Sequence, residues 1–135
     1  MIIGFANGCF DLLHEGHRHF LTECRRNCTY LIVALNSDDY CRFNKGPDRP
    51  YNVLALRMLH VRAFAEAVVP LYGRYATPTA MIDAIQPDVV FRGYDQDLWL
   101  VPCQLSQISH LPGFSTTLAA HGRKADAKPE PQRQP

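Results

Sequence analysis

The sequence predicts a single α/β domain of the Rossmann-like type, with a doubly wound parallel sheet and helices on both faces. Short apolar runs such as residues 31–35 alternate with segments of helical periodicity. Nearly continuous apolar strands are typical of a parallel sheet that is buried on both sides. Polar clusters follow three of the predicted strands, and ligands in open α/β sheets bind at the carboxyl ends of the strands.

The first elements follow one another in the order strand, helix, strand. Residues 2–6 form an apolar run that predicts the first strand, and a loop extends from there through Leu13. From about residue 16 to residue 27, apolar side chains fall on one helical face. Residues 30–35 predict a second buried strand, which ends at the polar residues 36–39.

The remaining elements are also marked by local signals. They are a Gly- and Pro-containing loop at residues 44–50, a long helix from Leu54 to near Glu66, strands at 67–71 and 88–92, and a short strand near 105–110. Between the third and fourth strands, Thr77 as N-cap and Pro78 at the first helical position predict a further helix.

Composition limits the function classes. The 135 residues suffice for one domain, and 47% hydrophobic with 20% charged residues is typical of a soluble globular protein. A net charge of +1 gives no strong positive electrostatic field that would attract a polyanion, so we expect no nucleic-acid partner. The longest apolar run is too short for a bilayer, and no signal peptide is recognised. We therefore expect a cytoplasmic protein without membrane contact.

The end of the sequence and the cysteines complete the organisation. Residues 122–135 contain three of the ten prolines and no large apolar side chain, so we expect a domain at 1–121 and a disordered tail at 122–135. The five cysteines form no Cys-x-x-Cys pair and are expected to be free thiols in a reducing compartment. Cys24 and Cys28 are spaced for half of a metal site, which is the alternative.

The segment after the first predicted strand carries the chemistry. Gly8 lets the backbone turn and approach a ligand closely. His14 and His17 are three residues apart at a predicted helix start, so both can project toward one point near the helix N-terminus. Free backbone N–H groups and the positive end of the helix dipole make such a point a natural phosphate site.

The same segment resembles a known family signature. Residues 8–17 read Gly-Cys-Phe-Asp-Leu-Leu-His-Glu-Gly-His, similar to the GxFDxxHxGH signature of cytidylyltransferase-like nucleotidyltransferases. The likeness continues to the Ser-Thr-Thr at 115–117 and covers roughly residues 2–118. Within the family the pattern is most similar to the ADP-heptose synthase adenylyltransferase domain, and next to glycerol-3-phosphate cytidylyltransferase.

The resemblance implies site residues. His14 and His17 would contact the triphosphate and stabilise the α-phosphoryl transition state, and Lys45 would bridge the two phosphate-bearing substrates. Further nucleotide contacts are implied for Gly8, Cys9, Phe10, Arg92, Gly93, Asp95, Ser115, Thr116 and Thr117. Acceptor contacts are implied for Asp11, Arg57 and Arg74. The alternatives are a helix cap for Asp11, a surface ion pair for Arg57 and a solvated side chain for Arg74 or Lys45.

The sequence also departs from the family pattern. His110 stands where the cytidylyltransferase subgroup carries an arginine, and an imidazole is a weaker cation at pH 7. After Thr117 the chain offers barely one helical turn before Gly122. The last phosphate-binding helix is therefore expected to be frayed or completed by a partner chain.

The functional expectation is a Mg²⁺-dependent nucleotidyltransferase that uses a nucleoside triphosphate and a small phosphorylated sugar or polyol. ATP with a sugar 1-phosphate is the first choice, and CTP with glycerol 3-phosphate or another phosphoalcohol is the alternative. The Mg²⁺ ion is expected to be carried by the triphosphate, with no protein ligand assigned. A nucleotide-binding module without turnover and a His/Cys metal-binding protein are alternatives from other classes. Family analogy implies a homodimer.

Overall fold

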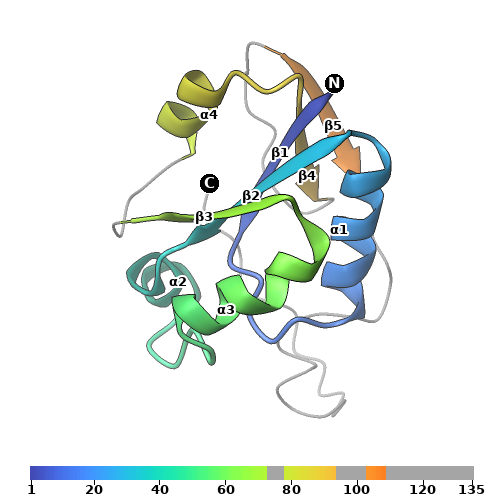
Figure 1. Ribbon diagram of the computed structural model, residues 1–135. Coiled ribbons are helices and arrows are strands. Elements are labelled where there is room, and N and C mark those ends of the chain that lie inside the picture. Colours follow the sequence, from blue (N-terminus) through green and yellow to red (C-terminus); the bar gives the residue numbers. More distant parts are fainter. Residues whose placement is uncertain (73–77, 94–102, 109–135) are drawn as a thin grey trace.

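The computed structural model describes residues 1–72, 78–93 and 103–108. In these ranges the chain forms a sheet with the strand order β3-β2-β1-β4-β5 (Figure 1). The elements in chain order are β1 (Ile3–Gly8), α1 (Glu15–Arg26), β2 (Tyr30–Asn36), α2 (Asp38–Lys45), α3 (Leu54–Val61), the 3₁₀ helix η1 (Arg62–Phe64), β3 (Ala67–Leu71), α4 (Thr79–Ile85), β4 (Val89–Gly93) and β5 (Gln104–Ile108).

Several residues that the sequence singles out lie outside the described ranges. They are Arg74, Thr77, Asp95, His110, Ser115, Thr116 and Thr117, together with the predicted tail at 122–135. Their roles, and the division between residues 121 and 122, therefore stay predictions.

All pairings among the described strands are parallel, and β1 lies in the middle of the sheet. Gly4 of β1 is in register with Leu31 of β2 on one side and with Val89 of β4 on the other. The chain proceeds outward from β1 through β2 to β3, and then returns to the other side of β1 for β4 and β5. This order confirms the doubly wound α/β fold, and it creates a topological switch point between β1 and β4.

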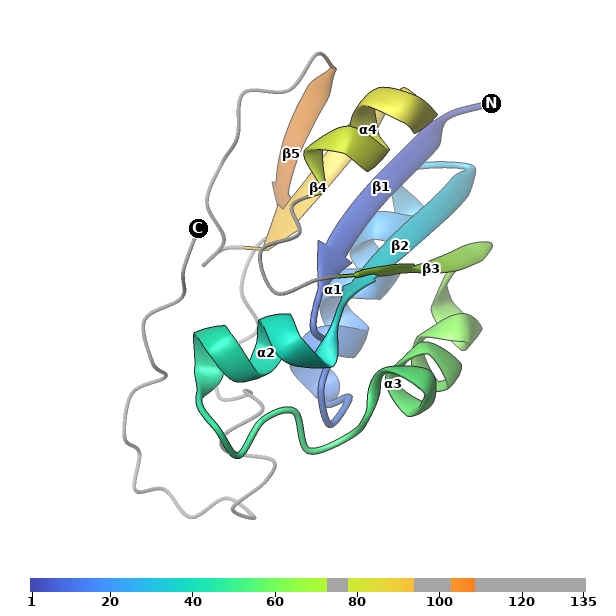
Figure 2. The same cartoon turned by 90° about the vertical axis from the view of Figure 1, so that its left-hand side faces the viewer.

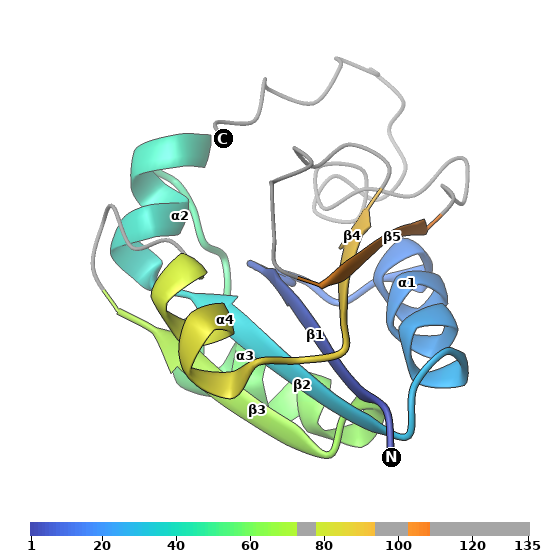
Figure 3. The same ribbon diagram turned by 90° about the horizontal axis from the view of Figure 1, so that it is seen from above.

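Helices cover both faces of the sheet. Figure 3 shows α1 and α4 on opposite sides of β1. Leu21 of α1 packs in one buried cluster with Ala6 and Val33, whereas Ile82 of α4 packs in a second cluster with Phe5. Successive side chains of a strand point to opposite faces. Because helices cover both faces of β1, apolar side chains point to both faces, and its sequence does not alternate between polar and apolar residues.

The helix α2 occupies a different position. It follows β2 directly and lies beyond the carboxyl ends of β1 and β2 (Figure 2). The sequence analysis places a polar strand end and a loop in this region and does not predict a helix. The local signals are present, because the side chain of Ser37 accepts a hydrogen bond from the backbone N–H of Tyr40 and Asp38 and Asp39 stand in the first turn.

Two further expectations about helices are corrected. The predicted helix from residue 54 to about 66 ends at Val61, and a short 3₁₀ helix continues it to Phe64. Pro78 is the N-cap of α4 and not its first helical residue. None of the helices in the described ranges has the length and apolar composition needed to cross a lipid bilayer.

Candidate active site

The loop that follows β1 is held in an unusual backbone conformation. Phe10 and Leu12 have φ angles of 51° and 50°, in the left-handed region that favours glycine. A Cβ atom at Gly8 would lie 3.1 Å from the ring of Phe10, so the glycine leaves room for that ring. Phe10 is itself buried and meets the ring of His17 edge to face, with 5.4 Å between the ring centroids. The ring of Phe10 in this loop thus packs against the ring of His17 in α1.

His14 and His17 form the start of α1 together. His14 is the N-cap, and its Nδ1 accepts a hydrogen bond from the backbone N–H of Gly16 at 3.1 Å. In return, the backbone N–H of His14 donates to Nδ1 of His17 at 3.4 Å. The two rings stack with 3.8 Å between their centroids. This is a reciprocal capping box built from two imidazoles, and it sets the orientation of both rings.

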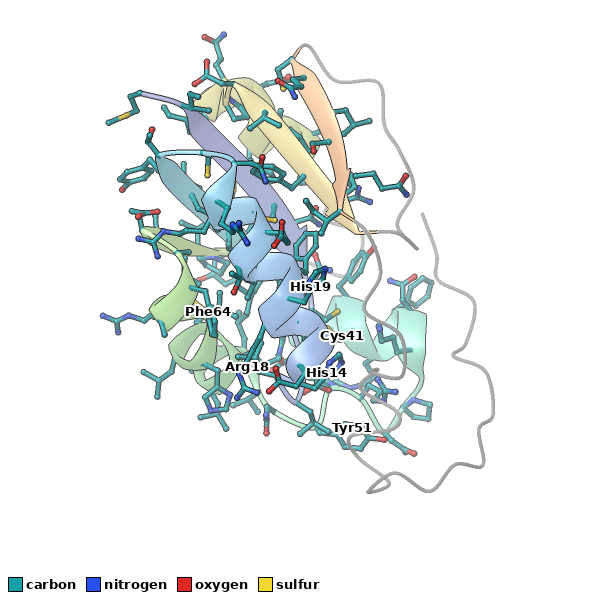
Figure 4. All side chains as sticks on the ribbon, turned by 90° about the vertical axis from the view of Figure 1, so that its right-hand side faces the viewer. His14, Arg18, His19, Cys41, Tyr51 and Phe64 are labelled. Atoms are coloured by element: carbon teal, nitrogen blue, oxygen red, sulfur yellow. The ribbon has the colours of Figure 1, made fainter. Side chains whose placement is uncertain are left out.

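The capping box also determines where the imidazole protons sit. A neutral imidazole carries one N–H and one acceptor nitrogen. Because the Nδ1 atoms of His14 and His17 both accept backbone N–H groups, the proton of each neutral ring is on Nε2. Figure 4 shows His14 at the beginning of α1 and His19 farther along the same helix. The site therefore combines two Nε2 donors with the positive end of a helix dipole, which suits an anionic ligand.

Asp11 holds a second loop against the first. Its carboxylate accepts hydrogen bonds from the backbone N–H groups of Tyr51 at 2.7 Å and Asn52 at 2.9 Å. The side chain is 3% exposed. Since His14 caps α1, the alternative in which Asp11 caps that helix is wrong. The structure places Asp11 where it positions the chain that follows the Gly- and Pro-containing loop.

Arg57 lies beneath the same two loops. It is fully buried, which rules out the alternative of a surface ion pair. Its Nε donates to the carbonyl oxygen of Asn52, one Nη to the carbonyl oxygen of Cys9 and the other to the carboxylate of Asp38, at 2.9, 2.8 and 2.7 Å. Arg57 thus connects three segments of the chain. The contact with an acceptor phosphate stays a prediction.

Lys45 is the last residue of α2. Gly46 follows as the C-cap with a φ of 118°, a conformation that L side chains rarely adopt. Lys45 is half-buried, and its charge helps to lower the pKa of Cys9. Its ammonium group therefore belongs to the electrostatic surroundings of Cys9. The bridging role between two phosphate-bearing substrates stays a prediction.

The thiols of Cys9 and Cys41 meet at the same place. The Cys41 thiol donates to Sγ of Cys9 with 2.6 Å between the sulfur atoms, and the side-chain amide of Asn36 donates to the same sulfur at 3.7 Å. The hydrogen bond from Cys41, the charges of Lys45 and Arg57 and the Asn36 amide lower the pKa of Cys9, against the opposing effect of burial. The sequence analysis implies only a nucleotide contact for Cys9, so this thiol pair is an addition.

Arg92 and Asn7 meet at the switch point of the sheet. Arg92 is buried at the end of β4 and donates to Oδ1 of Asn7 at 2.8 Å. Gly93 follows it, and its carbonyl oxygen accepts from the side-chain amide of Gln107 at 3.5 Å. Arg92 and Gly93 therefore lie at the carboxyl end of β4, the position from which the predicted nucleotide contacts would be made.

A protein-held metal finds no support in the described ranges. No three His, Cys, Asp or Glu side chains gather there. Cys24 and Cys28 are neighbours, but the Cys28 thiol donates to the backbone carbonyl of Cys24 at 3.3 Å. Both oxygens of Asp11 accept backbone N–H groups. These donor sets do not fit a Mg²⁺ cage, which needs carboxylates that face a ligand.

Comparison with known proteins decides the family. A family model described as cytidylyltransferase-like matches residues 5–114. The chain belongs to the cytidylyltransferase-like family. This confirms the resemblance read from residues 8–17, and with it the enzyme class of a nucleotidyltransferase. The matched range includes the loop after β1, α2 and the carboxyl ends of β1, β2 and β4.

Relatives of this cytidylyltransferase-like chain include several bacterial proteins described as bifunctional protein HldE. The one from Acidiphilium cryptum is 37% identical over 126 residues, which cover 85% of this chain and 26% of that protein. The one from Pectobacterium carotovorum is 35% identical over 136 residues, covering 93% of this chain and 28% of that protein. The chain thus spans about a quarter of the length of these relatives.

A solved structure with the same fold is the lipopolysaccharide core biosynthesis protein from Thermoplasma volcanium. It matches with a TM-score of 0.71 and 23% identity, covering 82% of this chain and 98% of that one. At this level of identity the match shows the fold alone. Together with the described strand order, it confirms the Rossmann-like α/β architecture of the cytidylyltransferase-like chain.

Most of the predicted site residues that the structure describes gather at one edge of the sheet. Three parts of the chain contribute them. The first strand β1, the loop after it and the start of α1 contribute Gly8, Cys9, Phe10, Asp11, His14 and His17. The helix α2 contributes Lys45, and β4 contributes Arg92 and Gly93. Sequence reasoning missed Cys41. The signal was available, because Cys41 stands one helical turn before Lys45 and the Ser-Asp-Asp at residues 37–39 marks a helix start.

Proposed function

We propose that the chain transfers a nucleoside monophosphate from a nucleoside triphosphate to a sugar 1-phosphate and releases pyrophosphate, with ATP as the nucleotide. The observation that carries the proposal is the pair His14 and His17, whose Nδ1 atoms are both held by backbone N–H groups at the start of α1. The motif resemblance to the ADP-heptose synthase adenylyltransferase domain supports ATP and a sugar 1-phosphate as the substrates.

The proposed reaction asks little proton transfer of the protein. A phosphate monoester has a second pKa of about 6, so the acceptor is already ionised at neutral pH. One of its oxygens attacks the α-phosphorus, the new O–P bond forms in line with the bond that breaks, and pyrophosphate leaves. The barrier is then set by alignment and by the charge on the α-phosphoryl oxygens.

The side chains at the site supply what such a barrier needs. In this proposal Nε2–H of His14 and of His17 donate to the oxygens of the α-phosphoryl group, where charge develops. The N-terminus of α1 adds its dipole, and Lys45 adds a positive charge between the two substrates. Because the rings are held through Nδ1, their donors are oriented before the substrate binds.

In this proposal the Mg²⁺ ion is carried by the triphosphate. No step of the proposed reaction is assigned to the ion. A homodimer and a cytoplasmic location remain predictions that rest on family analogy and on composition.

A substrate panel tests the proposal. Pyrophosphate release is measured with ATP and CTP, each combined with sugar 1-phosphates and with glycerol 3-phosphate, in the presence of Mg²⁺. Release confined to ATP and a sugar 1-phosphate supports the proposal, and release confined to CTP and glycerol 3-phosphate assigns the alternative cytidylyltransferase activity. Nucleotide that raises the melting temperature without any release would indicate a binding module without turnover.

A pair of substitutions separates the capping role of His14 from its chemical role. Asparagine can accept the Gly16 N–H as Nδ1 does, and asparagine is a favoured N-cap, but it carries no group at the position of Nε2. We therefore expect His14→Asn to keep the melting temperature and to lower kcat by about 10²–10³-fold, the usual cost of one transition-state donor. His19→Asn, on the same helix, is the matched control with unchanged kcat. Turnover near wild type in His14→Asn would contradict the mechanism.

A further inference from the structure

The close approach of two thiols is not explained by the proposed reaction. Cys9 and Cys41 are 32 residues apart in the chain, yet their sulfur atoms are 2.6 Å apart. Both are free cysteines. Cys9 lies in the loop after β1, and Cys41 is buried in α2. The two thiols are therefore in direct contact, which is the juxtaposition that a disulfide bond between these two elements requires.

The surroundings of Cys9 favour its thiolate. The Cys41 thiol and the side-chain amide of Asn36 both donate to its sulfur, and Lys45 and Arg57 contribute positive charge. A thiolate with cationic neighbours and hydrogen-bond donors is the form of cysteine that reacts with oxidants.

The other cysteines have the opposite environment. Burial raises the pKa of Cys24, which packs among apolar side chains, and burial with the nearby Glu66 raises the pKa of Cys28. Burial and the nearby Asp88 likewise raise the pKa of Cys103. These three thiols are therefore protonated at neutral pH and serve as internal controls for the reactivity of Cys9.

We propose that Cys9 and Cys41 are a site of reversible oxidation, at which a peroxide converts the two thiols into an intramolecular disulfide. The Cys9 thiolate attacks one oxygen of hydrogen peroxide and breaks the O–O bond, which yields a sulfenic acid and hydroxide. The sulfur of Cys41 then attacks Sγ of Cys9, the S–S bond forms, and the sulfenic oxygen leaves as water with the Cys41 proton. Two thiols and one peroxide give one disulfide and two water molecules.

The bond would join the loop after β1 to α2. That loop leads from Cys9 to His14, and α2 ends at Lys45. Both elements would thereby lose their independent motion. A small dithiol reductant reverses the bond by thiol–disulfide exchange.

The test uses the full chain and does not depend on turnover, so its outcome is separate from that of the proposed function. The reduced protein is treated with graded hydrogen peroxide and quenched with an alkylating reagent in denaturant. Intact mass and peptide mapping then locate the unlabelled cysteines. We expect a monomeric product that has lost two labels, with a Cys9–Cys41 linked peptide and full labelling of Cys24, Cys28 and Cys103, and full recovery of labels after dithiothreitol.

Two variants sharpen the result. In Cys41→Ser no resolving thiol is present, so Cys9 should accumulate as a sulfenic acid that a sulfenic-specific probe captures. Cys103→Ser is the matched control and should form the Cys9–Cys41 bond as the wild-type chain does. The proposal is overturned if peroxide leaves Cys9 and Cys41 fully labelled, or if the disulfide that forms contains a different cysteine or links two chains. The wild-type mapping decides the question even if Cys41→Ser fails to fold.

Discussion

The guanidinium of Arg57 and the carbonyl oxygen of Cys9 lie 2.8 Å apart, although 48 residues separate them in the chain. The same side chain donates to Asn52 and Asp38. Asn52 is held from its other side, because its backbone N–H donates to Asp11. The loop after β1, the start of α2 and the segment before α3 therefore depend on one buried cation and one buried carboxylate for their relative positions.

Replacing Arg57 should destabilise the fold strongly. Arg57→Met would leave two carbonyl oxygens and the Asp38 carboxylate without their donor, and breaking a buried pair in this way costs about 3–5 kcal/mol. Asp38 is partly exposed at 32%, so we expect a value near the lower end. The measurement is the free energy of unfolding from chemical denaturation.

The matched control is another arginine paired to an aspartate of α2. Arg42 donates to Asp39 at 3.0 Å, but the two side chains are 48% and 69% exposed. Exposed pairs contribute about 0–1 kcal/mol, so Arg42→Met should change the free energy of unfolding very little. If Arg57→Met and Arg42→Met lowered the free energy of unfolding equally, burial of Arg57 would not be what determines its contribution to stability.

Asp11→Asn should loosen the segment at Tyr51 and Asn52. An amide has one acceptor oxygen in place of two, so one of the two backbone N–H groups would face an NH₂ group. An unsatisfied buried group costs about 1–3 kcal/mol. Amide hydrogen exchange measures this directly: the exchange rates of Tyr51 and Asn52 should rise in Asp11→Asn. In Asp39→Asn, an exposed aspartate, they should not change.

A methyl group at Gly4 should not fit. A Cβ atom there would lie 2.6 Å from Cε2 of Phe91 and 2.9 Å from Sγ of Cys28. Phe91 is fully buried, so its ring has no open space to enter, and overpacking of this kind costs about 1–3 kcal/mol. Gly4→Ala should lower the melting temperature. Gly4→Ala combined with Phe91→Leu should be less destabilised than the sum of the two single variants, whereas simple additivity would exclude the clash.

The lowered pKa of Cys9 makes stability depend on pH. The unfolded chain has an ordinary thiol, so between the lowered folded value and the ordinary value the unfolded state binds more protons. The free energy of unfolding should therefore rise with pH across this window. The stabilisation that the Cys9 thiolate contributes should disappear as the pH falls through the pKa of Cys9 in the folded state. Cys9→Ser should flatten the slope in this window.

Thiolate absorbance measures the same titration directly. The hydrogen bond from Cys41 is the largest cause of the lowered pKa, ahead of the charge of Lys45. The titration midpoint of Cys9 should therefore move upward in Cys41→Ala, and by a smaller amount in Lys45→Met. Cys24→Ser, in α1, should leave it in place, because Cys24 is not among the groups that shift the pKa of Cys9. An unchanged midpoint in Cys41→Ala would show that the two thiols are not hydrogen-bonded.

The sequence by itself determined the strands and the parallel α/β class, and it predicts a phosphate site at residues 8–17. These features depend on short-range patterns: unbroken apolar runs at residues 30–35 and 88–92, and the glycine and histidine spacing of residues 8–17. The helix α2 was within reach of the same methods, since Ser37 caps it and Gly46 ends it. The sequence analysis missed this helix because its eight mostly polar residues offer few apolar positions to mark a helical face, which leaves the two end signals as its markers.

Only the tertiary structure decided which side chains act together. The contacts at the site join residues that are 32 to 85 positions apart in the chain. They are Asp11 with Tyr51, Arg57 with Cys9, Cys9 with Cys41, and Arg92 with Asn7. Such contacts depend on the order of the strands, which brings the carboxyl ends of β1, β2 and β4 to one edge of the sheet. No local pattern encodes that order. It arises when helices on both faces bury the apolar strands, and it places Arg57 as a buried support of the loops around the site.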